Sequence, residues 1–201
     1  MNEHIYNDDF FKSHIAPNSI WSVGYPPLAK ALLDTLQFEH SPVRVWDMGC
    51  GVGNLIGALY DLECDVRGIE GSVAALPYIP SRLISRIVFG DILLDHPVPE
   101  SDLVICTEVA EHVPPNQADR LVEQIVKANG QYVYFTAAPP GQGGTDHVNE
   151  QPKQYWVEKF RKWNWDLNLT MTARLVKNLI GTPMRWYTNN SMIFSPMGRG
   201  Q

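Results

Sequence analysis

From residue 43 onward, short apolar runs alternate with longer stretches whose apolar positions recur every three or four residues. Short runs bounded by turn residues are typical of buried strands, and the longer repeats are typical of helices that cover a sheet. Helices are expected at residues 54–62 and 115–127, and a brief helix should follow the capping residue Ser72. The predicted strands are residues 43–48, 65–70, 84–89, 102–107 and 131–136.

The two ends of the chain predict further elements. A helix is expected at residues 26–37, with Pro26 and Pro27 near its start, where proline fits best. After residue 150 the pattern predicts a helix at residues 151–162, a strand near residues 166–172, a short helical piece and a last strand from Arg185 through Phe194.

Strands that alternate with helices indicate an α/β fold, because right-handed crossovers place successive strands parallel and put helices on both faces of the sheet. The late strand pair fits an antiparallel strand at the edge of such a sheet. We therefore predict a doubly wound, seven-stranded, mostly parallel sheet with an antiparallel edge strand. The 201 residues, 44% of them hydrophobic, suffice for one core. Residues 42–201 should form this domain and residues 1–41 a helical lid or cap segment.

A glycine-rich turn follows the first predicted strand, with the sequence Asp47-Met48-Gly49-Cys50-Gly51-Val52-Gly53. Glycine lets the chain turn sharply and lets its backbone approach a ligand without a Cβ in the way. A dinucleotide-binding turn spaces its glycines as G-x-G-x-x-G, whereas here the third glycine is residue 53 and residue 54 is Asn. This spacing disfavours a nicotinamide dehydrogenase.

Acidic residues stand at the ends of the next strands, in the segments Glu70-Gly71, Gly90-Asp91-Ile92 and Asp102 to Glu108, and the turn Glu111-His112-Val113 follows. Taken in this order with the glycine turn, residues 43–136 resemble class I S-adenosylmethionine-dependent methyltransferases, which implies S-adenosyl-L-methionine as cofactor. Glu70 would accept hydrogen bonds from the ribose diol, and Asp91 one from the adenine amino group, while the Ile92 backbone amide would donate to a ring nitrogen of the adenine. The resemblance implies cofactor contacts from Asp47, Gly49, Cys50, Gly51, Gly53, Glu70, Gly71, Asp91, Ile92, Thr107 and Glu108.

The loops after the fourth and fifth strands are expected to hold the reacting groups, because ligands of open α/β sheets lie beyond the carboxyl ends of the strands. Glu108, Glu111 and His112 have the spacing i, i+3, i+4, which would place them on one helical face. The loop after the fifth strand offers Asp146 and His147, either of which could take a proton from a hydroxyl acceptor. The candidate catalytic residues are His147, Asp146, Glu108 and His112.

The set Glu108, Glu111, His112 and His147 also resembles the metal site of small-RNA 2′-O-methyltransferases and of ubiquinone-pathway O-methyltransferases. The E-x-x-E-H pattern is frequent in the superfamily without a metal, and two His with two Glu match a hard cation only in part. We therefore predict His147 as a general base and no metal.

Composition narrows the choice of acceptor. A net charge of −6 argues against a nucleic-acid surface, and three cysteines indicate neither a disulfide framework nor a zinc ribbon. The sequence lacks a basic, apolar leader and a long apolar run, which predicts a cytosolic protein without a membrane partner.

The favoured function is O-methylation of a small molecule or glycan. The alternatives are a metal-assisted RNA or nucleotide ribose methyltransferase and a weakly catalytic, cofactor-binding partner subunit.

Overall fold

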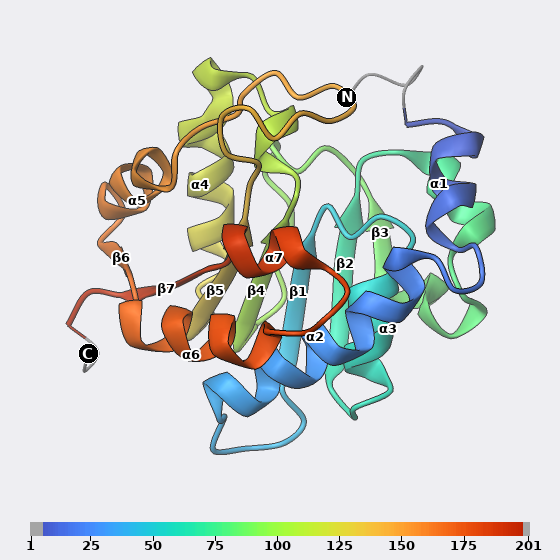
Figure 1. The fold of residues 1–201 in the computed structure, drawn as a ribbon, viewed down its shortest axis with the longest axis horizontal. Helices are drawn as coiled ribbons and strands as arrows, with labels where there is room; N and C mark the ends of the chain where they lie inside the picture. Colours follow the sequence, from blue (N-terminus) through green and yellow to red (C-terminus); the bar gives the residue numbers. More distant parts are fainter. Residues whose placement is uncertain (1–5, 199–201) are drawn as a thin grey trace.

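The computed structural model of the protein describes residues 6–198, and its centre is a seven-stranded sheet in the order β3-β2-β1-β4-β5-β7-β6 (Figure 1). Strands β1 to β5 are parallel, whereas β7 runs antiparallel to both of its neighbours. The predicted α/β class is confirmed, with the antiparallel strand one place in from the edge. The strands are β1 (Arg44–Met48), β2 (Asp65–Glu70), β3 (Ile87–Phe89), β4 (Leu103–Thr107), β5 (Tyr132–Thr136), β6 (Trp165–Leu167) and β7 (Met192–Pro196).

Helices cover both faces of the sheet, and α2, α3, α6 and α7 cross in front of it in Figure 1. The α-helices are α1 (Asp8–His14), α2 (Ile20–Leu36), α3 (Asn54–Tyr60), α4 (Ala118–Lys127), α5 (Lys153–Arg161), α6 (Leu169–Leu179) and α7 (Arg185–Asn190). Short 3-10 turns are η1 (Val73–Tyr78), η2 (Ser81–Arg86), η3 (Ala110–His112) and η4 (Pro115–Gln117). None of the helices within residues 6–198 has the length and apolar character needed to cross a bilayer.

The alternation of side chains along the strands divides the interior into two cores. Leu103 and Ile105 of β4 pack in one core with residues of α2, α3 and α6. Val104 and Cys106 of the same strand pack in the other with residues of α4 and α5. Because successive side chains of a strand point to opposite faces, a continuous apolar strand indicates burial on both sides. The apolar runs predicted as strands therefore fit the centre of a two-sided sheet.

Helix α2 begins earlier than predicted. Ser19 caps it by accepting a hydrogen bond from the Ser22 amide at 3.1 Å, so the helix starts at Ile20 rather than near residue 26. Pro26 and Pro27 consequently lie inside the helix instead of in its first turn. The serine cap determines the start here, and the position of the prolines was the wrong signal.

The C-terminal region differs most from the prediction. The expected strand at residues 166–172 ends at Leu167, because Asn168 caps α6 through a 3.0 Å bond from the Met171 amide. The expected strand Arg185 through Phe194 is instead helix α7 followed by β7. Tyr187 is buried in the core with α2 and α6, and this packing overrides the strand propensity of the local aromatic residues.

The third strand is shorter than predicted, since residues 84–86 belong to η2 and β3 starts at Ile87. The remaining predicted elements agree with the structure within a few residues. Ser72 caps η1 as expected, with its hydroxyl accepting from the Ala74 amide at 3.3 Å.

Candidate active site

The glycine turn lies between β1 and α3 at the carboxyl end of the sheet. Gly49, Gly51 and Gly53 have φ angles of +82°, +56° and +80°, a region that side chains rarely adopt. The amides of Gly49 and Cys50 donate to the Ile69 carbonyl, at 2.8 and 3.1 Å, and so tie the turn to β2. A Cβ built on Gly51 would meet no atom of the described chain within 4 Å. The turn therefore borders open space that a ligand can enter.

Glu70 ends β2 and joins two turns of the site. Its Oε2 accepts from the Gly51 amide and its Oε1 from the Ser72 amide, both at 2.8 Å. Glu70 is 5% exposed; burial raises the pKa of its carboxyl group, and backbone hydrogen bonds oppose this shift. A carboxylate has further lone pairs, so these bonds leave it able to accept from a vicinal diol.

Asp47, near the end of β1, is 3% exposed, and its Oδ1 has no hydrogen-bond partner among residues 6–198. Burial and the nearby Glu70 carboxylate raise the pKa of Asp47 to about 8. An unpaired buried oxygen costs free energy, and a cationic ligand group would relieve that cost. The site is therefore suited to a positively charged group beside the glycine turn.

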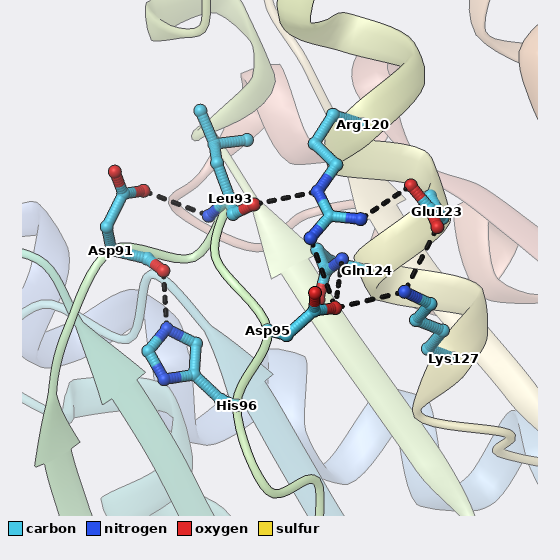
Figure 2. A network of polar contacts seen from close by, with 8 residues as sticks. All are labelled: Asp91, Leu93, Asp95, His96, Arg120, Glu123, Gln124 and Lys127. Carbon is cyan, nitrogen blue, oxygen red and sulfur yellow. Dashed lines mark hydrogen bonds and ion pairs between the residues drawn. The ribbon is translucent and has the colours of Figure 1, made fainter.

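The remaining predicted cofactor contacts lie close to the ends of β1 to β4. Thr107 ends β4, and Gly71 lies between Glu70 and Ser72. In the loop after β3, the Asp91 Oδ1 accepts from the Leu93 amide at 2.9 Å, and Ile92 is buried (Figure 2). The topology thus places the glycine turn, Glu70 and the loop after β3 together at the carboxyl ends of the strands.

Glu111 belongs to η3 and has no solvent exposure. Its Oε1 accepts from the Ala138 amide at 3.3 Å, while its Oε2 lacks a partner within the described residues. Its backbone carbonyl accepts from Val148 and Asn149, both at 2.9 Å. Burial, with the neighbouring Glu108 carboxylate, raises the pKa of Glu111 to about 8. This residue consequently holds η3 against the loop after β5.

His112 and His147 lie beside Glu111. The Nδ1 of His112 donates to the Asp146 carbonyl at 3.1 Å, because a carbonyl can only accept. The two imidazole rings meet edge to face with centroids 5.0 Å apart. Ligand atoms of Glu111, His112 and His147 lie within 4.8 Å of one another. Three of the four residues predicted as a metal set therefore come together.

Glu108 does not join this cluster. The prediction that Glu108, Glu111 and His112 share one helical face is wrong, since Glu108 has φ +52° and precedes the short turn η3. Its Oε1 accepts from Asn190 at 3.3 Å and its Oε2 from Gln142 at 3.4 Å. Glu108 thus connects the end of β4 to the loop after β5 and to α7.

Glu150 was not singled out by the sequence, although it organises the loop after β5. Its Oε1 accepts from His147 Nδ1 at 2.8 Å and from the Gly143 amide at 2.6 Å, and its Oε2 accepts from the Gly141 amide at 2.7 Å. Hydrogen bonding to His147 lowers the pKa of Glu150. An acid three residues after a histidine, beside a glycine loop, was the available signal.

The chain segment before α2 packs against His112 and Ser72. The Tyr6 ring packs edge to face on His112, at 5.7 Å between centroids, and its carbonyl accepts from the Ser72 hydroxyl at 2.9 Å. The Tyr6 hydroxyl is buried and has no partner in the described part of the chain. The His14 carbonyl accepts from Asn54 at 3.1 Å. A lid function of residues 1–41 stays a prediction, and residues 1–5 lie outside the described range.

Aromatic side chains of α2 and α7 meet next to Glu108 and its partner Asn190. The hydroxyls of Tyr25 and Tyr187 are 3.2 Å apart. Trp21 and Trp186 pack edge to face with centroids 5.5 Å apart. The sequence did not identify the α7 residues as part of the site, because that segment was predicted to be a strand.

Comparison with known proteins agrees with this geometry. Residues 46–134 match the family described as methyltransferase domain. The chain is 30% identical over 120 residues to a ubiquinone biosynthesis O-methyltransferase of Alkalilimnicola ehrlichii, covering 56% of this chain and 44% of the relative. Residues 46–134 are therefore similar to a methyltransferase domain, as the resemblance to class I S-adenosylmethionine-dependent methyltransferases predicts. The chain spans less than half the length of the curated methyltransferases that it matches first.

Solved structures show the same methyltransferase fold. The magnesium protoporphyrin IX methyltransferase of Synechocystis, with bound SAH, has a TM-score of 0.62 at 17% identity and covers 86% of this chain and 82% of its own. The [4+2]-cyclase SpnF has a TM-score of 0.57 at 13% identity and covers 86% of this chain and 81% of its own. The class I methyltransferase fold therefore also carries other chemistry, and the acceptor must be argued from the site.

Gly51→Val should abolish binding of S-adenosylhomocysteine, because a branched side chain at positive φ strains the turn and enters the open space beside it. Isothermal calorimetry measures this. Gly181→Val is the matched control, since Gly181 also has a positive φ and an open Cβ position but lies in the turn after α6. Equal affinity of both variants for S-adenosylhomocysteine would contradict the assignment of the glycine turn to the cofactor site.

Asp47 should release its proton when S-adenosylmethionine binds at pH 7, because its pKa of about 8 falls when a cation approaches. Calorimetry in two buffers of different ionisation enthalpy measures the proton release, which Asp47→Asn should reduce. A raised pKa also means that the ligand-free protein loses stability as pH rises from about 4 to about 8. Asp47→Asn should remove part of that loss in thermal unfolding. Unchanged proton release in the variant would contradict the assignment.

Proposed function

We propose that this protein transfers a methyl group from S-adenosylmethionine to a hydroxyl of a small molecule, with His147 as general base. The observation that carries the proposal is the pair His147–Glu150, which lies next to Glu111 and beyond the carboxyl ends of β4 and β5. Relatives named ubiquinone biosynthesis O-methyltransferase support oxygen as the accepting atom and a small acceptor.

The residues at the glycine turn fit the cofactor. The open space at Gly51 offers room for the cofactor. The Asp47 Oδ1, which has no partner among residues 6–198, offers a counter-charge for the ammonium group. The buried Glu70 carboxylate offers an acceptor for the ribose diol. When bound, S-adenosylmethionine supplies a methyl group on its sulfonium, and the neutral thioether that remains after transfer is a good leaving group. The protein then has to align the acceptor with that methyl and remove the hydroxyl proton.

Glu150 prepares His147 for proton removal. Because an ionised carboxylate can only accept, its bond to His147 Nδ1 keeps the imidazole proton on that atom. Nε2, which lies against Gly144, then carries no proton and would accept the hydroxyl proton. Bound S-adenosylmethionine would supply the methyl group to the hydroxyl oxygen and leave as neutral S-adenosylhomocysteine. The two glycine amides bonded to the same carboxylate hold this loop around the histidine.

The chemistry around Glu108 favours a small acceptor. Trp21, Tyr25 and Trp186 are half-buried where α2 meets α7, and Asn190 of α7 donates to Glu108. Partly exposed aromatic side chains beside a few polar groups are typical of small-molecule sites. The net charge of −6 disfavours a long phosphate backbone as partner.

A second candidate is metal-assisted transfer, including transfer to a ribose hydroxyl. It is favoured by the ligand atoms of Glu111, His112 and His147, which lie within 4.8 Å of one another, and by Glu111 Oε2, which has no partner within residues 6–198. A divalent cation would favour the ionised form of Glu111 and could polarise the acceptor oxygen. Glu108 would not be a ligand in this arrangement, since its carboxylate is bonded to Asn190 and Gln142.

Incubation with methyl-labelled S-adenosylmethionine and fractionated hydroxyl compounds, glycans and RNA tests the proposed function. Label should appear in low-molecular-weight hydroxyl compounds, and Glu70→Ala should reduce both cofactor affinity and transfer by about 10-fold or more, as expected for lost bonds to a charged acceptor. Label in RNA would overturn the proposed acceptor class. Cofactor binding without transfer to any fraction would favour the partner-subunit alternative.

Chelation separates the two candidate mechanisms once an acceptor is known. With His147 as base, EDTA should leave turnover unchanged and His147→Ala should lose roughly 10²–10⁴-fold. With a metal, EDTA should abolish turnover until magnesium or manganese is returned, and Glu111→Gln should be as damaging as His147→Ala. Glu158→Gln is the matched control for loss of a glutamate, because Glu158 is exposed on α5 and lies outside the cluster. Reversible inactivation by EDTA would contradict the base mechanism.

A further inference from the structure

Helix α4 contacts the loop after β3 through charged side chains. The Nε of Arg120 donates to the Leu93 carbonyl at 2.8 Å, and its Nη2 lies 3.1 Å from Asp95 Oδ1 (Figure 2). One guanidinium therefore bonds both the backbone and a side chain of this loop. A guanidinium serves several acceptors in fixed directions, which suits it to fixing a turn.

The guanidinium is itself fixed on α4. Its Nη1 donates to Glu123 Oε2 at 2.7 Å, one helical turn further along. Lys127 lies 3.0 Å from both Asp95 Oδ1 and Glu123 Oε1 and completes a ring of alternating charges (Figure 2). Lys127 reaches the loop through the Asp95 side chain, whereas Arg120 bonds the Leu93 backbone carbonyl.

The same turn presents the predicted adenine contacts. The Leu93 amide donates to Asp91 Oδ1 at 2.9 Å, and the Leu94 amide donates to the Asp91 carbonyl at 3.0 Å. Ile92, between them, is 5% exposed and packs in the core with α4. The position of the Asp91 carboxylate and of the Ile92 amide thus depends on a turn whose Leu93 carbonyl is held by Arg120.

We infer that Arg120 is a positioning residue for recognition of the adenine base. It touches no part of the cofactor; it fixes the Asp91–Leu93 turn so that the carboxylate and the Ile92 amide keep the geometry that distinguishes an amino group from a carbonyl on the base. This inference rests on the proposed function, because it requires S-adenosylmethionine to bind in the orientation assigned above.

The test compares Arg120→Met with Lys127→Met, which removes a cation from the same charge ring. Calorimetry measures the affinity of each for S-adenosylhomocysteine and for its analogue with hypoxanthine in place of adenine. Wild type and Lys127→Met should prefer the adenine ligand equally. Arg120→Met should bind S-adenosylhomocysteine about 10-fold more weakly, the scale of one charge-assisted hydrogen bond. Its affinity for the analogue should barely change, so its preference for adenine should shrink.

Circular dichroism should show both variants folded, and Arg120→Lys provides a milder change that keeps the positive charge. A lysine carries its three donors on one nitrogen and lacks the wide, fixed fork of the guanidinium, so it should hold the Leu93 carbonyl and both acids less well and show an intermediate preference. An adenine preference in Arg120→Met equal to that of wild type would overturn the inference alone. Failure of the wild-type protein to bind S-adenosylhomocysteine would overturn the proposed function and this inference with it.

Discussion

The hydrogen bonds from the Gly51 and Ser72 amides to the Glu70 carboxylate connect the parts of the site. They bring together the turn after β1, whose glycines have positive φ angles, and the start of η1. Tyr6 then packs over this junction through the Ser72 hydroxyl, and it also contacts His112. One buried acid at the end of β2 thereby sets the relative positions of the glycine turn, the N-terminal segment and η3.

The neighbouring acids Asp47 and Glu111 show the free-energy cost of burying polar groups in this site. Asp47 and Glu111 each keep one buried oxygen without a partner in the described chain, and an unsatisfied buried polar group costs about 1–3 kcal/mol. Proteins tolerate this where the rest of the fold over-determines the positions, as the two cores on either side of β1 and β4 do here. The raised pKa values of these acids follow from the same lack of solvent and partners.

The sequence predicts best what depends on neighbouring residues. The five parallel strands and the acids at their ends follow from local apolar runs and from the topology that such runs impose. Side chains that meet from distant segments left no local signal: Tyr6 reaches His112, and Asn190 of α7 reaches Glu108. Helix α7 was predicted as a strand because its aromatic residues favour strands, whereas packing on α2 decides its form.

Helices α6 and α7 lie between β6 and β7 and outside the segment that matches the methyltransferase domain family. Cofactor-turn residues lie within 46–134, the segment shared with other methyltransferase domains, whereas Trp21, Tyr25, Trp186 and Tyr187 lie outside it. Substitutions of Trp21 or Trp186 would thus change the contacts between α2 and α7 without altering any residue of the glycine turn. The packing of the two ends of the chain can therefore be varied separately from the sequence of the cofactor turn.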